Sequence, residues 1–120
     1  KFCYEVSLGN PLTIWKQNFN QVRPYLGLND AVRSIIHFLD NIQHFNQTYN
    51  VISGNFKLSD VIETIEKIVG TIELNMVDTP LLNQFSYDVS DEKVRNIGYE
   101  PKDKLEISIK NTLDMLKKLK

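Results

Sequence analysis

The hydrophobic pattern of the chain predicts three helices whose apolar residues recur every three or four positions. The first follows an N-cap at Asn29, the second follows a cap at Ser59 and ends at Gly70, and the third begins with a capping box formed by Asp103 and Glu106. The apolar positions of the three helices are Val32, Ile35, Ile36 and Leu39; Val61, Ile62, Ile65, Ile68 and Val69; and Leu105, Ile109, Leu113 and Leu116. We expect the second set to be a buried stripe.

Short segments rich in β-branched and aromatic residues lie between these helices and predict extended chain. Residues 11–15 and 22–28 form two of them, and Pro24 favours an edge or irregular strand in the second. Residues 48–52 predict a buried strand that ends at a Gly-Asn turn pair. Residues 72–77 alternate apolar and polar side chains, which is the period of a half-covered strand.

Two shorter helices complete the pattern. Residues 1–8 predict the last turns of a helix that Gly9 ends in a left-handed conformation, and Ser90 caps a short helix that ends before Gly98. The chain of 120 residues contains no internal repeat and no linker. It therefore predicts a single domain, residues 1–120, of mixed α/β class.

Composition and charge exclude several classes of function. The 14 Lys and Arg residues balance 15 Asp and Glu residues, so no net field would attract nucleic acid or an anionic membrane. No apolar run is long enough to cross a bilayer. Cys3 is the only cysteine, which excludes an internal disulfide and a cysteine-based zinc site. We expect a soluble cytoplasmic protein without a metal.

Two side chains are candidates for binding a ligand. Trp15 ends an apolar strand just before a polar loop, where its indole could stack on a nucleotide base or serve as an ordinary core or rim residue. Arg23 lies on a short rigid segment, where its guanidinium could donate a fork of hydrogen bonds to a pyrophosphate or form a surface salt bridge. The residues alone leave both pairs of alternatives open.

The sequence contains no recognisable set of catalytic residues. His37 and His44 are seven residues apart, and no carboxylate or thiol pattern near them completes a metal site. No Ser, His and Asp set suggests a nucleophile, and the five glycines do not form a phosphate-binding loop. We therefore assign no catalytic residue to this chain.

Five segments in a fixed order resemble the extended short-chain dehydrogenase/reductases that act on nucleotide sugars. They are residues 9–15, 21–32, 49–54, 87–93 and 97–101. The first reads Gly-Asn-Pro-Leu-Thr-Ile-Trp and the second contains Gln-Val-Arg-Pro-Tyr and later Asn-Asp. The others read Tyr-Asn-Val-Ile-Ser-Gly, Tyr-Asp-Val-Ser followed by Lys, and Ile-Gly-Tyr-Glu-Pro. Together they cover nearly the whole chain.

The resemblance implies roles for individual residues. Trp15 would line the pocket for the nucleotide base, Arg23 would contact the diphosphate, and Asp30 would lie behind it and orient the loop. Many family members carry a second arginine before the Tyr-x-Asp-x-Ser segment, and this chain has none there. Contacts from that stretch would have to come from the neutral side chains of Asn83 and Gln84.

The family's glycine-rich dinucleotide motif and its Tyr-x-x-x-Lys catalytic pair are not in these residues. The resemblance therefore implies the carboxy-terminal substrate-binding lobe of an NAD-dependent nucleotide-sugar epimerase or dehydratase, without its Rossmann half. The start at Lys1, with no initiating Met, agrees with a cut. NAD would be bound mainly by the missing half, and this lobe would bind the nucleotide sugar. Epimerisation, dehydration and reduction remain open as reactions of the parent enzyme.

A second hypothesis is a non-catalytic binding or interaction module that has kept the family lobe. The reading frame upstream of Lys1 would separate the two hypotheses. A lobe without its Rossmann half would also expose an apolar face, so we expect self-association.

Overall fold

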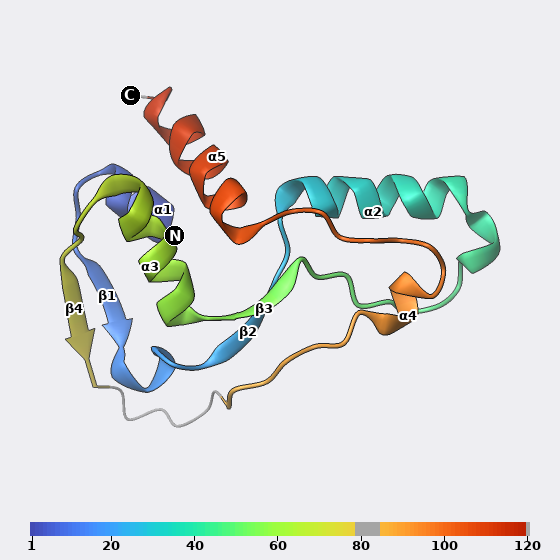
Figure 1. Cartoon of the computed structure of the whole chain (residues 1–120), viewed down its shortest axis with the longest axis horizontal. Helices are drawn as coiled ribbons and strands as arrows, with labels where there is room; N and C mark the ends of the chain where they lie inside the picture. The colour runs from blue at the N-terminus through green and yellow to red at the C-terminus, as the bar shows by residue number, and fades with distance from the viewer. Residues whose placement is uncertain (79–84, 120) are drawn as a thin grey trace.

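The computed structural model describes residues 1–78 and 85–119. Figure 1 shows a body built from α1, β1, β4, α3 and α5, and an arm formed by α2 and α4. The elements in chain order are α1 (Phe2–Ser7), β1 (Leu12–Trp15), the 3-10 turn η1 (Lys16–Asn18), β2 (Val22–Tyr25), α2 (Leu28–Asp40), the 3-10 turn η2 (Ile42–His44), β3 (Gly54–Lys57), α3 (Leu58–Val69), β4 (Leu74–Val77), α4 (Glu92–Arg95) and α5 (Leu105–Lys117).

The molecule is flat and extended. Its principal dimensions are 48 × 38 × 19 Å and its radius of gyration is 16.6 Å. A compact domain of this length has a radius of gyration of about 14 Å. Much of the chain therefore lies near the surface. No helix among the described residues combines the length and the apolar character needed to span a membrane.

The strands form two separate two-stranded sheets. β1 pairs with β4 in parallel, from Leu12 opposite Leu74 to Trp15 opposite Val77. β2 pairs with β3 in antiparallel orientation. Pro24 cannot donate a backbone hydrogen bond, and the sheet it belongs to has only two strands, so the predicted edge position is confirmed.

The predicted strand at residues 48–52 is wrong. The strand begins instead at Gly54, where a turn was expected, because residues 54–57 pair with the whole of β2. The amide of Ser53 already donates to the carbonyl of Tyr25, at 2.7 Å. This bond places residue 53 beside β2, one residue before the paired strand begins.

The core lies around α3, as its apolar stripe predicts. Ile65 has no solvent exposure and packs in a cluster with Ile109 and Leu113 of α5. On the other side of α3, Ile62 packs against Leu12 and Ile14 of β1. These two clusters hold the helices of the body to the parallel strand pair.

Helix starts differ from the predicted caps. α3 begins at Leu58 rather than after Ser59, and the carboxylate of Asp60 accepts the amide hydrogen of Lys57 at 2.9 Å. α5 begins at Leu105 after an N-cap at Lys104. The predicted cap of α5, Asp103, has its carboxylate at the start of α2 instead.

The short helices follow the sequence more closely. α1 spans Phe2–Ser7, and Gly9 has the left-handed conformation expected after it, with φ of 77°. Within the predicted segment after Ser90, four residues are helical, and the hydroxyl of Ser90 accepts the amide hydrogen of Glu92 at 3.3 Å. Gly98 has φ of 87°, which agrees with its predicted role after this helix.

Candidate functional site

Trp15 stands at the carboxyl end of β1, on its exposed face. Leu12 and Ile14 of this strand are buried whereas Thr13 and Trp15 point away from the core, and the Trp15 side chain is 42% exposed. The next residue, Lys16, forms an ion pair of 2.9 Å with Asp78, which follows β4. The indole is therefore available to a ligand at the edge where β1 and β4 end (Figure 1).

Arg23, in β2, lies in a network with the chain that follows residue 84. Its Nη1 donates to the carbonyl oxygens of Val22 and Phe85, and its Nη2 donates to the Gln21 side-chain oxygen at 2.7 Å. The guanidinium carbon lies 4.8 Å from the centre of the Tyr87 ring. Three of the five N–H donors of the guanidinium thus have partners among the described residues. The remaining two could serve a ligand.

The segment after residue 84 runs alongside β2. The amide of Val22 donates to the hydroxyl of Ser86 at 2.9 Å, and the amide of Tyr87 donates to the carbonyl of Val22 at 3.3 Å. The geometry thus joins Arg23 to the segment that comes directly after two other predicted binding residues. Those two, Asn83 and Gln84, lie outside the described residues.

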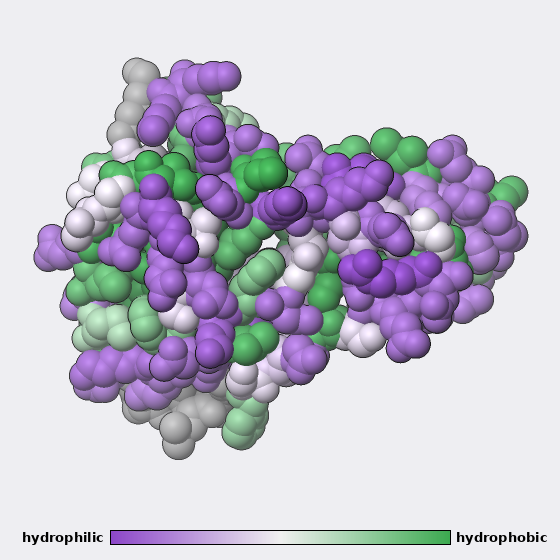
Figure 2. All heavy atoms as spheres, in the orientation of Figure 1, coloured by the Kyte–Doolittle hydropathy of each residue, from purple (hydrophilic) through white to green (hydrophobic). Residues whose placement is uncertain are grey.

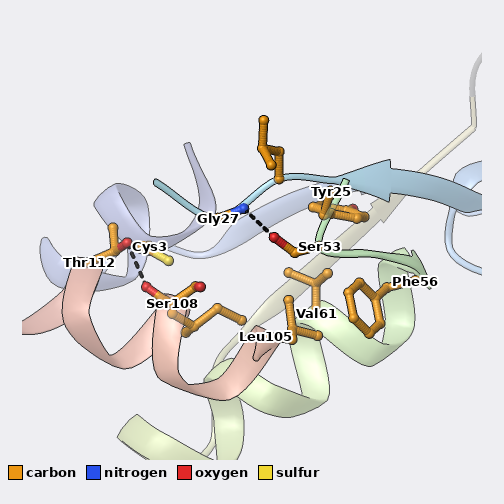
Figure 3. Close-up of a pocket in the computed structure, with 11 residues that line it drawn as sticks. Cys3, Tyr25, Gly27, Ser53, Phe56, Val61, Leu105, Ser108 and Thr112 are labelled. Carbon is orange, nitrogen blue, oxygen red and sulfur yellow. Dashed lines mark hydrogen bonds between the residues drawn. The ribbon is translucent and has the colours of Figure 1, made fainter. Parts of the chain in front are cut away.

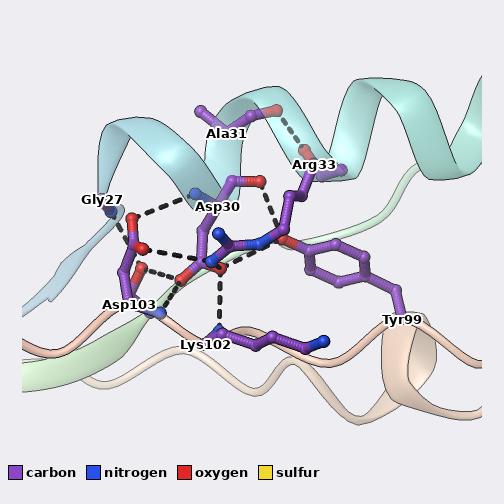
Figure 4. Close-up of polar contacts among 9 residues, drawn as sticks. Gly27, Asp30, Ala31, Arg33, Tyr99, Lys102 and Asp103 are labelled. Atoms are coloured by element: carbon purple, nitrogen blue, oxygen red, sulfur yellow. Dashed lines mark hydrogen bonds and ion pairs between the residues drawn. The ribbon is translucent and has the colours of Figure 1, made fainter.

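Asp30, whose side chain is fully buried, is the centre of a second polar cluster (Figure 4). Its carboxylate accepts hydrogen bonds from the Ser53 hydroxyl at 2.6 Å and from the amides of Lys102 and Asp103 at 2.8 and 2.9 Å. It also forms an ion pair with Arg33. Burial alone would raise the pKa of Asp30, but these hydrogen bonds outweigh it and lower the pKa to about 2.

The same cluster begins helix α2. The N-cap is Gly27 rather than the predicted Asn29, and the carboxylate of Asp103 accepts the amide hydrogen of Asp30 at 3.0 Å. Tyr99 donates its hydroxyl to the backbone carbonyl of Asp30 at 2.7 Å. Three distant parts of the chain therefore meet at one helix end.

The structure separates Asp30 from Arg23. The partners of Asp30 are residues of α2, Ser53 and the chain at 99–103, whereas those of Arg23 are its neighbours in β2 and residues 85–87. The predicted position of Asp30 directly behind Arg23 has no contact to support it. Its supporting role toward the loop stays a prediction.

Sequence reasoning missed the other members of this cluster. Ser53 and Tyr99 stand in the family-like segments 49–54 and 97–101, but the resemblance assigns them no role and no spacing links them to Asp30. The signal at Asp103 was misread. Asp103 precedes a helix and was assigned to capping that helix, because a cap donated to a different helix cannot be inferred from spacing.

A small apolar pocket lies between β2, β3, α3 and α5 (Figure 3). Its volume is about 140 Å³, and Tyr25, Phe56, Val61 and Leu105 are among its lining residues. Cys3 also lines it, and burial raises the pKa of its thiol. No group of three or more His, Cys, Asp or Glu residues within the described part of the chain could hold a metal ion.

The fold is similar to that of solved epimerases and dehydrogenases, some of them in complex with NAD or NADPH. No protein-family model matches the sequence. Solved structures match nearly all of this chain, which spans about 40% of their length, at identities of 15–21%. The expected resemblance to extended short-chain dehydrogenase/reductases is thus confirmed for the fold, together with the mixed α/β class.

Three of these structures illustrate the similarity. UDP-glucose 4-epimerase of Thermus thermophilus, in complex with NAD, has a TM-score of 0.78 and 21% identity, over 96% of this chain and 38% of its own. UDP-glucuronic acid 4-epimerase of Bacillus cereus, in complex with UDP-glucuronic acid and NAD, has a TM-score of 0.75 and 20% identity. The match covers 98% of this chain and 38% of the epimerase. An L-threonine dehydrogenase of Cupriavidus necator has a TM-score of 0.78 and 15% identity. The match covers 96% of this chain and 40% of the dehydrogenase.

Proposed function

We propose that this chain is the substrate-binding lobe of an NAD-dependent nucleotide-sugar epimerase or dehydratase. The observation that carries the proposal is that two consecutive strands, β1 and β2, supply an exposed indole and a guanidinium with two N–H donors that have no partner among the described residues. A flat apolar ring suits a nucleotide base, and a guanidinium suits diphosphate oxygens. The similarity to an epimerase in complex with UDP-glucuronic acid supports the same ligand class.

In this proposal the lobe orients the substrate and does not itself transfer a proton or a hydride. Trp15 stacks on the base, Arg23 binds the diphosphate, and Asn83 and Gln84 add neutral hydrogen bonds. Holding both ends of the nucleotide fixes the attached sugar over the reactive groups of the other half, which lowers the entropic part of the barrier. Asp30 keeps the surrounding loops in place.

We assign NAD to the part of the enzyme outside this chain. When bound there, NAD would take up and return a hydride. Phosphate groups commonly bind at open helix N-termini. Here the start of α2 is occupied by the carboxylate of Asp103 and the start of α3 by that of Asp60, and either carboxylate would repel a phosphate. These two helix starts therefore do not fit the phosphates of a dinucleotide. The proposal also includes a cytoplasmic location and, for the isolated lobe, self-association through an exposed apolar face.

The experiment that tests the proposed function is Arg23→Ala in the polypeptide that includes the nucleotide-binding half. We expect the free energy of binding UDP-glucose to weaken by about 1–3 kcal/mol, the cost of losing a charged hydrogen bond. Isothermal titration calorimetry measures it. Arg95→Ala is the matched control, because Arg95 is an exposed arginine on α4 whose guanidinium pairs with Asp91. An unchanged binding constant for Arg23→Ala would remove this residue from the site.

A further inference from the structure

The apolar pocket of Figure 3 is enclosed by five elements that are distant from one another in the chain. Its walls include Cys3 of α1, Tyr25 of β2, Phe56 of β3, Val61 of α3 and Leu105 of α5. Figure 2 shows hydrophobic atoms gathered where the body meets the arm, which is where these elements approach one another in Figure 1. The two side chains assigned above to the nucleotide do not line this pocket.

The pocket has the size of a cavity that holds one aromatic ring. Its volume is about 140 Å³. An apolar cavity of about 150 Å³ in a protein core stays dry and binds benzene. Close-packed interiors rarely leave a void of this size. The pocket is therefore space that the chain's own side chains do not fill and that a small ligand can occupy.

The lining contains hydroxyl groups but, among the described residues, no formal charge. The Ser53 hydroxyl donates to the carboxylate of Asp30 at 2.6 Å and accepts from the amide of Gly27 at 2.8 Å. The Thr112 hydroxyl donates to the backbone carbonyl of Ser108 at 2.8 Å. An ionised ligand would lose its hydration in the pocket and would find no counter-charge there. The lining therefore favours an uncharged ligand.

Two aromatic rings in the wall favour an aromatic ligand. The ring centres of Tyr25 and Phe56 are 6.1 Å apart, and the ring planes are tilted by 58°. Aromatic rings attract one another in such tilted arrangements, and a third ring beside these two can adopt the same geometry. The hydroxyls of Tyr25 and Ser108 form no hydrogen bond within the described part of the chain. The pocket can therefore accept one polar group together with a ring.

A groove leads from the surface to the pocket. It lies between the start of α2 and α5, and its volume is about 340 Å³. Leu28 and Met115, which also line the groove, are 75% and 55% exposed, so the groove is open to solvent. The groove and the pocket share four lining residues, Leu26, Gly27, Ser108 and Thr112. A small molecule can therefore reach the pocket without unfolding of either helix.

From the volume, the uncharged lining and the aromatic walls, we propose that this pocket is a binding site for a small uncharged aromatic alcohol of the phenol type. The ring occupies the apolar space beside Tyr25 and Phe56, and the ligand hydroxyl bonds to that of Ser108. Because the site uses neither Trp15 nor Arg23, its occupation is separate from the binding of a nucleotide sugar. The inference does not depend on the proposed function.

Fluorine NMR of 4-fluorophenol tests the site in the 120-residue chain and in the polypeptide that includes the nucleotide-binding half. We expect saturable binding to both, with a Kd of about 1 mM or lower, which is within the range for a ligand of this size. The charged 4-fluorobenzoate should not bind, and UDP-glucose should not displace 4-fluorophenol. Equal binding of 4-fluorobenzoate, displacement by UDP-glucose, absence of saturation, or binding to the shorter chain alone would each overturn the proposal.

A pair of variants at one position assigns the binding to the pocket. Ser108→Phe fills the space with its own ring and should raise the Kd of 4-fluorophenol at least ~10-fold. Ser108→Ala removes only the hydroxyl and should raise the Kd by about 3-fold. Ile107→Phe, which adds a ring at a 51% exposed position of α5, should not change it. Loss of binding in both Ser108 variants, or in neither, would overturn the proposal.

The wild-type chain offers a readout that requires no variant. Cys3 is the only cysteine and lines the pocket, so its rate of alkylation by iodoacetamide reports whether the pocket is occupied. Saturating 4-fluorophenol should slow this reaction at least ~3-fold at constant pH, because the bound ring restricts access to the thiol. The same concentration of 4-fluorobenzoate should leave the rate unchanged. An unchanged rate with saturating 4-fluorophenol would place the ligand elsewhere and overturn the proposal.

Discussion

Replacing Asp30 with alanine should lower the free energy of unfolding by about 3–5 kcal/mol, because several donors around it lose their acceptor, at about 1–3 kcal/mol each. The side chain is fully buried, and its removal leaves the Ser53 hydroxyl and two backbone amides without their acceptor. Arg33 loses one of its two carboxylate partners and keeps Asp103. Urea denaturation followed by circular dichroism measures the change. Asp114→Ala on the exposed side of α5 is the control, and it should change stability by less than about 0.5 kcal/mol.

The same variant should change the response of stability to acid. Since the pKa of Asp30 falls from 3.8 to about 2 on folding, its ionised form contributes about 2 kcal/mol at neutral pH. That contribution is present above about pH 4 and is lost as the pH falls through 2. The free energy of unfolding of the wild-type chain should therefore fall by this amount as the solution is acidified, and that of Asp30→Ala should not. An equal loss in both proteins would contradict the assignment.

Gly27→Ala should destabilise the chain by about 2–3 kcal/mol, because the added methyl group overpacks a closed site and displaces a helix cap. A Cβ atom at this position would lie 2.1 Å from Oδ2 of Asp103 and 2.7 Å from its Cβ. The backbone of Gly27 itself is ordinary, with φ of −71°. The cost therefore comes from the close approach and not from the backbone conformation. Thermal unfolding measures it.

A double-mutant cycle with Asp103→Gly isolates that cause. Once the Asp103 carboxylate and its Cβ are removed, the alanine at position 27 has room, so Gly27→Ala should cost little in the Asp103→Gly background. Fully additive losses would show that the close approach does not determine the effect. In that case another property of Gly27 would have to explain its presence.

The sequence predicted the parts of the fold that depend on local periodicity. The stripes of α3 and α5 follow from their own spacing, and the buried positions Ile65 and Leu113 agree with it. Helix starts were less accurate, because the N-cap interactions of α2 come from a residue more than seventy positions away in the chain. Residues 48–52 have strand composition but no strand partner among the described residues, and composition cannot supply a partner.

The candidate site was only partly accessible from the sequence. Trp15 lies on the exposed face of its strand, as alternation within β1 requires. The contacts of Arg23 with residues 85–87 join segments more than sixty positions apart, so no local pattern could predict them. The exposure of the apolar positions of α2 was equally hidden, because periodicity identifies an apolar face but does not say what covers it.

The most direct test of nucleotide recognition uses Trp15 as a reporter, since it is the sole tryptophan of the chain. UDP-glucose titrated into the 120-residue chain should quench its fluorescence in a saturable way, and glucose alone should not. The quenching should weaken in Arg23→Ala and persist in Arg95→Ala. Unchanged Trp15 fluorescence up to about 10 mM UDP-glucose, where even an affinity of about −4 kcal/mol would be detected, would contradict the account.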